Sequence, residues 1–157
     1  PGRSLDRIDW SGAELILSAA HNSESLSHDL RRLGSEKHVL VVGMTQKEDL
    51  SESIEPLLNL EGRIRTIVTE VHGGRSPSVS AELLAEHLSG DSKEPPTIIT
   101  EPIEAIDAAS AVAREEGCIV YLTGSVYLVG KAIEEIASLD GGDLWDHLEA
   151  HLSMSER

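Results

Sequence analysis

The sequence predicts an α/β fold built on a mostly parallel sheet. Apolar runs of four to seven residues recur along the chain, and their continuous hydrophobicity is typical of strands that are covered on both faces. A segment with helical spacing of apolar residues follows each run. Strand and helix alternate five times, which favours parallel strands joined by right-handed crossovers. The predicted architecture is a Rossmann-like three-layer sandwich, with a sheet of five or six strands flanked by helices.

The five predicted strands are each bounded by turn-forming residues. They are ELILSAA at 14–20, HVLVVGM at 38–44, RIRTIVT at 63–69, PTIIT at 96–100 and CIVYLTG at 118–124.

Helical spacing places five helices after these strands, at 23–33, 47–60, 78–88, 103–116 and 126–138. In the first, Leu26, Leu30 and Leu33 fall on one face, as a helix packed against a sheet requires.

The chain of 157 residues has the length of a single domain, 1–157. The breaker pair Gly141-Gly142 precedes a last stretch of helical spacing at 143–153, which predicts a final helix. Because the chain opens on Pro1, in what reads as the middle of a motif, we expect it to be a fragment of a longer protein.

The composition indicates the compartment in which the protein functions and the classes of partner that it does not bind. A formal net charge of −15 disfavours binding to nucleic acid. Cys118 is the single cysteine, which excludes an internal disulfide and fits a reducing compartment. No apolar stretch approaches the roughly 18 residues that span a bilayer, and no secretory leader is evident. We therefore expect a cytoplasmic protein with no nucleic-acid or membrane partner.

Candidate binding residues follow the predicted strands directly. Parallel strands end at one edge of a sheet, and ligands bind in the crevice outside those ends. His21 and Asn22 follow the first strand, and Arg75 follows the third. Gly124 and Ser125 follow the fifth, where the N-terminus of a helix offers N–H groups and a positive dipole end to a carboxylate or phosphate.

Each of these residues also has a purely structural interpretation. Asn22 or Ser23 caps a helix with His21 as a solvated turn residue, Ser125 is an N-cap, or Arg75 is a solvated loop residue. Both interpretations remain open on the sequence alone.

Two tempting motifs fail on their spacing. GSVYLVGKA lacks the glycine spacing of a phosphate loop, and Ala132 stands where Ser or Thr would hold magnesium. His147 and His151 form H-x-E-x-H rather than the metalloprotease H-E-x-x-H, so a solvated helix face is favoured there over a metal site.

The motifs follow one another in a recognisable order: PGR, AHN between strand and helix, VVGM, R-S-P before a helix, and YLTGSVYLVG. In this order the chain resembles, over nearly its whole length, the C-terminal domain of folylpolyglutamate synthase/dihydrofolate synthase in the Mur ligase superfamily. The resemblance implies an ATP-dependent amide ligase that adds L-glutamate to a pteroate or folate carboxylate through an acyl phosphate. It also implies that ATP and Mg²⁺ are held by a central ATPase domain that this chain lacks, so no cofactor is expected in this domain alone.

The resemblance assigns roles position by position. Arg3 matches the arginine of PGR near the nucleotide, His21 the histidine of the family's D-G-A-H-N-P, and Ser125 the serine of the final G-S that is associated with glutamate. Ser18 stands where the family has the aspartate that contacts the nucleotide, so a single hydroxyl replaces a carboxylate. The expected residues are His21 as catalytic, Ser125, Gly124 and Arg75 as substrate-binding, Arg3, Ser18 and Asn22 as nucleotide-binding, and no metal ligand.

Two other functions are compatible with the same residues. One is a diverged Rossmann-type nucleotide-binding or regulatory module without ligase activity. The other is a domain of a peptidoglycan-precursor Mur ligase, against which the ending TGSVYLVG favours the folate branch.

Overall fold

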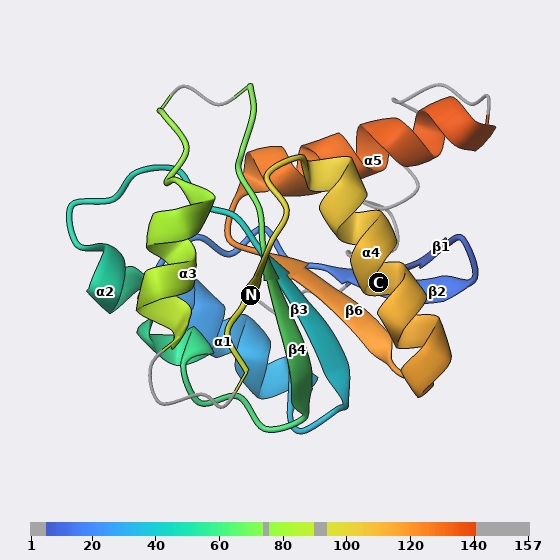
Figure 1. The fold of residues 1–157 in the computed structure, drawn as a ribbon, viewed down its shortest axis with the longest axis horizontal. Helices are drawn as coiled ribbons and strands as arrows, with labels where there is room; N and C mark the ends of the chain where they lie inside the picture. Colours follow the sequence, from blue (N-terminus) through green and yellow to red (C-terminus); the bar gives the residue numbers. More distant parts are fainter. Residues whose placement is uncertain (1–5, 74–75, 90–93, 141–157) are drawn as a thin grey trace.

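The computed structural model describes residues 6–73, 76–89 and 94–140. They form a six-stranded sheet in the order β1-β2-β6-β3-β4-β5, with helices on both faces (Figure 1). The predicted three-layer α/β architecture is confirmed.

Five of the strands run parallel and coincide with the five predicted from the sequence. They are β2 (Ala13–Leu17), β6 (Ile119–Thr123), β3 (His38–Val42), β4 (Arg63–Val68) and β5 (Thr97–Ile98). Every residue of β3 and β6 is buried, because helices cover both faces of the sheet at its centre.

The sixth strand, β1 (Asp6–Trp10), is not among the five predicted runs. It pairs antiparallel with β2 through a hairpin whose turn residues Ser11 and Gly12 have φ values of 49° and 86°. Exposure alternates along the strand, with Trp10 buried and Asp9 exposed. A half-exposed edge strand lacks the continuous apolar run by which the other strands were predicted.

One face of the sheet is covered by α1 (Ser23–Leu33), α2 (Leu50–Ile54), the 3₁₀ helix η1 (Glu55–Leu57) and α3 (Ala81–Ser89). The other is covered by α4 (Pro102–Glu116) and α5 (Val126–Asp140). The chain crosses the sheet in one direction from β2 to β5 and then turns back to place β6 between β2 and β3. This reversal moves the crossover helix α4 to the opposite face, as crossovers of one hand require.

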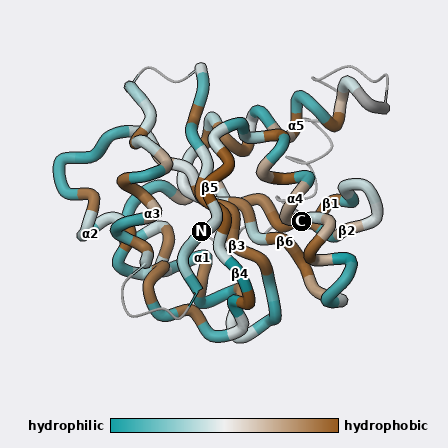
Figure 2. Tube along the Cα trace, viewed as in Figure 1, coloured by the Kyte–Doolittle hydropathy of each residue, from teal (hydrophilic) through white to brown (hydrophobic). Residues whose placement is uncertain are grey.

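Each face has its own hydrophobic core, and the strands contribute alternate residues to the two. Leu40 and Val42 of β3 pack under α1 and α3, whereas Val39 and Val41 pack under α4 and α5. Figure 2 shows the strands as a hydrophobic centre between hydrophilic loops. In the described part of the chain, no helix has the length and hydrophobicity needed to cross a membrane.

Two predicted helices are shorter in the structure. The helix expected at 47–60 starts at Leu50, because the Asp49 side chain caps it by accepting a hydrogen bond from the Glu52 amide at 3.0 Å. Pro56 has no N–H for an α-helical bond, and the chain continues there as η1. The helix expected at 78–88 starts at Ala81, whose amide donates to Glu70 Oε2 at 2.9 Å. The predicted helix at 143–153 lies outside the described residues.

Candidate functional site

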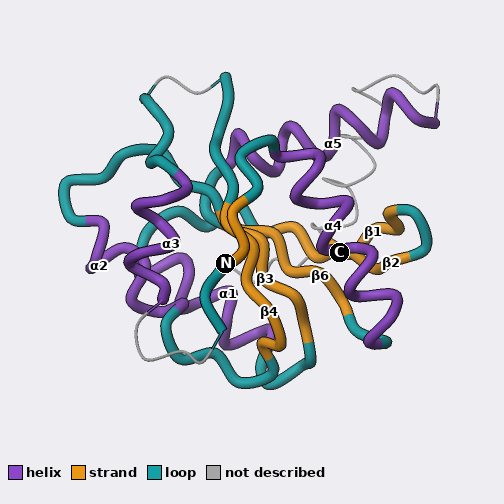
Figure 3. The backbone as a smooth tube through the Cα atoms, in the orientation of Figure 1, coloured by secondary structure: helices purple, strands orange, loops and turns teal. Residues whose placement is uncertain are grey.

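The carboxyl ends of the parallel strands create a topological switch around β6. After β6 the chain turns to α5 on one face, whereas after its neighbours β2 and β3 it turns to α1 and α2 on the other. In Figure 3 the loop after β4 extends to the top of the view, and the loop after β3 extends to the upper left, where it leads to α2. Chains that diverge to opposite faces leave a crevice between them, and this is the usual ligand site of such sheets.

Hydrogen bonds join the ends of β2 and β6 at this switch. The Ser18 amide donates to Leu122 O at 2.9 Å, and the Gly124 amide donates to Ala20 O at 3.0 Å. The loop that carries His21 and the turn that carries Ser125 are therefore neighbours, although about a hundred residues separate them in sequence. Both segments lie at one edge of the sheet, as their positions after parallel strands predict.

Gly124 has a steric reason to be glycine. Its φ is 113°, a region that other residues rarely adopt. A Cβ at this position would collide with the carbonyl oxygen of Gly43, which follows β3. The turn after β6 therefore touches the end of β3 as well as that of β2.

His21 and Asn22 are both exposed in the loop between β2 and α1. Asn22 caps α1: its Oδ1 accepts from the Ser25 amide at 2.8 Å, and the Ser25 hydroxyl completes a capping box. His21 Nδ1 lies 3.2 Å from Ala19 O. The capping interpretation of Asn22 describes its geometry, while the His21 ring is accessible at the edge of the sheet.

Ser125 caps α5. It is 3% exposed, and its Oγ accepts from the Tyr127 amide at 3.1 Å. Val126 and Tyr127 are exposed in the first turn of the helix. The positive end of the α5 dipole thus lies at the carboxyl edge of the sheet beside two accessible side chains.

Ser18 is buried and already engaged. It is 2% exposed, and its hydroxyl donates to Asp29 Oδ2 at 2.6 Å. Thr123 Oγ1 in turn donates to Ser18 Oγ at 3.1 Å. Ser18, which was expected to contact the nucleotide, therefore donates its hydroxyl proton to another residue of this chain.

Asp29 was not among the predicted site residues. It lies on α1, three residues after Leu26 and one before Leu30, so a carboxylate interrupts the apolar face of the helix. That interruption is the sequence signal that identifies it.

Tyr121 of β6 lies in the same environment. Burial, together with the charge of Asp29, raises the pKa of the Tyr121 phenol to about 12. The Tyr121 hydroxyl lies close to those of Ser18 and Thr123, which oppose this rise in pKa, but it makes no hydrogen bond of good geometry. The carboxylate of Asp29 is thus the charged group of an otherwise neutral, hydroxyl-lined environment.

Two predicted contacts, Arg3 and Arg75, lie outside the described residues, so their roles stay predictions. Within the described ranges, no group of three or more His, Cys, Asp or Glu side chains has an arrangement that would hold a metal ion.

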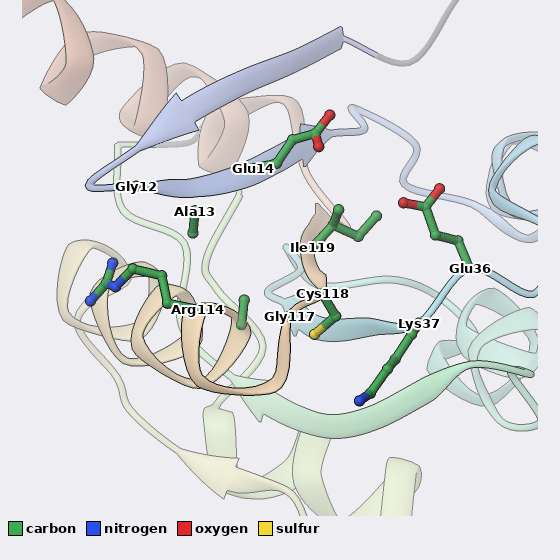
Figure 4. Close-up of a pocket in the computed structure, with 10 residues that line it drawn as sticks. Gly12, Ala13, Glu14, Glu36, Lys37, Arg114, Gly117, Cys118 and Ile119 are labelled. Atoms are coloured by element: carbon green, nitrogen blue, oxygen red, sulfur yellow. The ribbon is translucent and has the colours of Figure 1, made fainter.

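A pocket of about 520 Å³ lies at the other end of the sheet, beside the start of β2 and β6 and the end of α4 (Figure 4). The charged side chains Glu14, Glu36 and Lys37 at this pocket form ion pairs with other side chains of the protein. Arg7 contacts Glu14 at 3.1 Å and Glu36 at 2.9 Å, and Lys37 contacts Glu116 at 3.5 Å. Burial raises the pKa of the Cys118 thiol there, so it stays protonated. We therefore place the candidate site at the carboxyl edge and not in this pocket.

No protein-family model and no curated protein matches the sequence. Solved structures do match. E. coli FolC in complex with ADP has a TM-score of 0.70 and 23% identity, over 90% of this chain and 33% of that one. Folylpolyglutamate synthase of Mycobacterium tuberculosis complexed with ADP and AMPPCP has a TM-score of 0.71 and 22% identity, over 91% and 33%. A UDP-N-acetylmuramoyl-L-alanyl-D-glutamate–2,6-diaminopimelate ligase has a TM-score of 0.50 and 20% identity, over 79% and 26%.

The described fold is therefore one that occurs within ligase chains. The particular resemblance predicted from the sequence, to folylpolyglutamate synthases, is confirmed at the level of the fold. The chain spans about a third of the length of the synthase structures that it matches.

Proposed function

We propose that this chain is the C-terminal domain of an ATP-dependent amide ligase that adds L-glutamate to dihydropteroate or a folate through an acyl phosphate. The observation that supports it best is the joined carboxyl edge. On a fold shared with folylpolyglutamate synthases, the His21 loop and the Gly124–Ser125 turn are hydrogen-bonded neighbours at the switch point.

In this proposal the domain closes over a central ATPase domain of the same polypeptide, which supplies the ATP and Mg²⁺ site. The matched E. coli structure holds ADP, and a Yersinia pestis synthase was solved with AMPPNP and Mn ion. Those ligands belong to the longer chains, and we assign nucleotide and metal to the full-length protein.

The residues at the carboxyl edge have different proposed roles, which follow from their chemistry. The start of α5, at Gly124 and Ser125, offers a positive dipole end to the glutamate carboxylate, and Arg75 is a second proposed contact for it. His21 is the proposed catalytic residue, on the same edge of the sheet, which would face the central domain. Arg3 and Asn22 are proposed on the nucleotide side, where Ser18 acts indirectly because its hydroxyl is bound to Asp29.

The direct test is an assay of the full-length protein with ATP, Mg²⁺ and dihydropteroate or folate. We expect ADP release that depends on added L-glutamate, and a G-x-x-x-x-G-K-[ST] loop upstream of this chain. Release that is independent of glutamate, or no release by a folded full-length protein, contradicts the proposal.

The match to a diaminopimelate ligase keeps a peptidoglycan-precursor ligase as the second candidate. Replacing folate and glutamate by a nucleotide-linked peptide precursor and an amino acid separates the two, since ADP release follows only the right pair. The nucleotide-binding or regulatory module is tested by titrating ATP into this chain alone. Binding at micromolar affinity, about −8 kcal/mol, favours that module over the ligase domain.

A further inference from the structure

A chain of hydrogen bonds at the switch point ends on the Asp29 carboxylate of α1. Thr123 Oγ1 donates to Ser18 Oγ at 3.1 Å, and Ser18 Oγ donates to Asp29 Oδ2 at 2.6 Å. Thr123 and Ser18 are 0% and 2% exposed, so water does not compete for these hydroxyls. A carboxylate can only accept, so Ser18 gives its one hydroxyl proton to Asp29. Thr123 must therefore be the donor in its bond to Ser18.

The short bond to Asp29 has the length of a charge-assisted O–H···O⁻ bond, which falls at roughly 2.5–2.7 Å. Such bonds are about twice as strong as those between neutral groups. A buried hydroxyl that loses its acceptor is left with a desolvated donor, so the carboxylate holds the Ser18 rotamer and, through it, that of Thr123. The Asp29 carboxylate is therefore the acceptor at the end of a chain of bonds that connects both strand ends.

Each hydroxyl in the chain precedes one of the two proposed site segments. Ser18 comes three residues before His21, and Thr123 comes two residues before Ser125. The link is reinforced by Ala20 O, which accepts from the Gly124 amide at 3.0 Å. A change at Asp29 is thus transmitted to both segments of the candidate site and not to one alone.

We propose that Asp29 is a positioning residue of the carboxyl-edge site, which holds the His21 loop and the Ser125 turn in register through Ser18 and Thr123. The inference rests on the proposed function, because the two segments it aligns are those assigned to glutamate and to the reaction.

The test is Asp29→Asn in the full-length protein, with Asp107→Asn as the matched control. Asn has the shape of Asp and keeps an acceptor oxygen, so the fold is retained while the charge is lost. Asp107 likewise accepts a single short side-chain bond, from Trp10 Nε1 at 2.7 Å, but it lies on α4 on the other face of the sheet.

We expect kcat/KM for glutamate to fall on the order of tenfold in Asp29→Asn, since small misplacements of reacting groups are costly, and to stay unchanged in Asp107→Asn. Ser18→Ala should have a similar or larger effect, and the double variant Ser18→Ala/Asp29→Asn should be no worse than Ser18→Ala, because Ser18→Ala removes the bond that Asp29→Asn weakens. Equal kinetics for Asp29→Asn and wild type, or fully additive losses, overturn the inference.

Amide hydrogen exchange of the same proteins separates this inference from the proposed function. The Gly124 amide should exchange about tenfold faster in Asp29→Asn and not in Asp107→Asn. If the wild-type protein shows no glutamate-dependent ADP release, the proposed function fails, and the exchange result alone decides whether Asp29 aligns the two segments. Unchanged exchange at Gly124 refutes the positioning role in either case.

Discussion

At the scale of single residues, the edge of the sheet combines groups that serve the fold with groups that are free to meet a ligand. Asn22 and Ser125 each use a side-chain oxygen to cap a helix. The exposed His21 lies beside Asn22 and has no capping role. The strand-end rule located all three from the sequence, because strand ends are encoded locally. Asp29 was not found by this rule, because it lies inside α1 and not at a strand end. Its interruption of the apolar face of the helix is visible in the sequence, but its contact with Ser18, on another element, is not.

The first prediction concerns His21 and Ser125 in the full-length protein. Replacing either by Ala should raise KM for glutamate or lower kcat, since losing a hydrogen bond to a charged ligand costs about 1.5–3 kcal/mol, or about 10- to 150-fold in kcat/KM. Steady-state kinetics with varied glutamate measure the effect.

Two control variants separate catalysis from structure in that experiment. Ser80→Ala removes a comparable cap from α3, where Ser80 Oγ accepts from the Leu83 amide at 3.2 Å. His87→Ala removes a half-buried histidine from the same helix. Kinetic losses in these controls as large as in His21→Ala and Ser125→Ala would return both site residues to structural roles.

The second prediction concerns His38, which is fully buried at the start of β3. Its Nδ1 lies 2.8 Å from Glu36 O and must donate to it, while its buried Nε2 has no hydrogen-bond partner. Burial, aided by the nearby charge of Arg63, lowers the pKa of His38 below its ordinary value, although the bond to Glu36 opposes the shift. The folded protein therefore holds this histidine neutral.

The pH dependence follows from that direction. Below about pH 6.5 the unfolded chain takes up a proton at this histidine before the folded chain does, so stability is complete above that pH and is lost as the pH falls. The slope from one proton is at most about 1.4 kcal/mol per pH unit. Urea unfolding at pH 8 and pH 5.5 should show this component in the wild type and lose it in His38→Leu. An identical pH slope in both proteins would be inconsistent with a neutral buried His38.

At the scale of elements, two features of the chain escaped the sequence analysis for different reasons. The edge strand β1 is anchored by Trp10, which is 3% exposed and donates to Asp107 of α4 at 2.7 Å. That contact joins residues 97 positions apart, so no window of local sequence contains it. The boundary of α2, in contrast, was available in the sequence, since Asp49 and Pro56 are standard signals for the start and the end of a helix.

The third prediction compares two glycines of one structural unit, the turn and helix after β6. Gly124→Ala should destabilise the protein by at least about 1–3 kcal/mol, because φ is 113° and the new Cβ meets the Gly43 carbonyl. Gly130→Ala should instead stabilise it by roughly 0.5–1 kcal/mol, because Gly130 lies exposed inside α5 and a Cβ added there would meet nothing within 4 Å. Chemical denaturation of both variants gives the two signs, and effects of the same sign would contradict the described turn.

At the scale of the whole molecule, the sequence predicted the layers but not the order of the strands. Continuous apolar runs such as HVLVV and IVYLT encode burial on both faces, and burial of this kind requires helices above and below the sheet. The position of β6 between β2 and β3 depends on which faces pack together, and this is a property of the assembled core. The shared carboxyl edge was nevertheless predictable, because parallel strands end together whatever their order.

The last prediction is that this chain alone folds but does not catalyse ligation. Its two cores share one sheet, so it should unfold cooperatively in urea. In the proposed function, the groups that position a reacting phosphate belong to the central domain, and the Ser18 hydroxyl of this chain is bound to Asp29. Glutamate-dependent ADP release by the chain alone should stay at background, with the full-length protein as the positive control. Robust turnover by the chain alone, under conditions where its unfolding transition confirms a folded state, would show that it carries the complete reaction site.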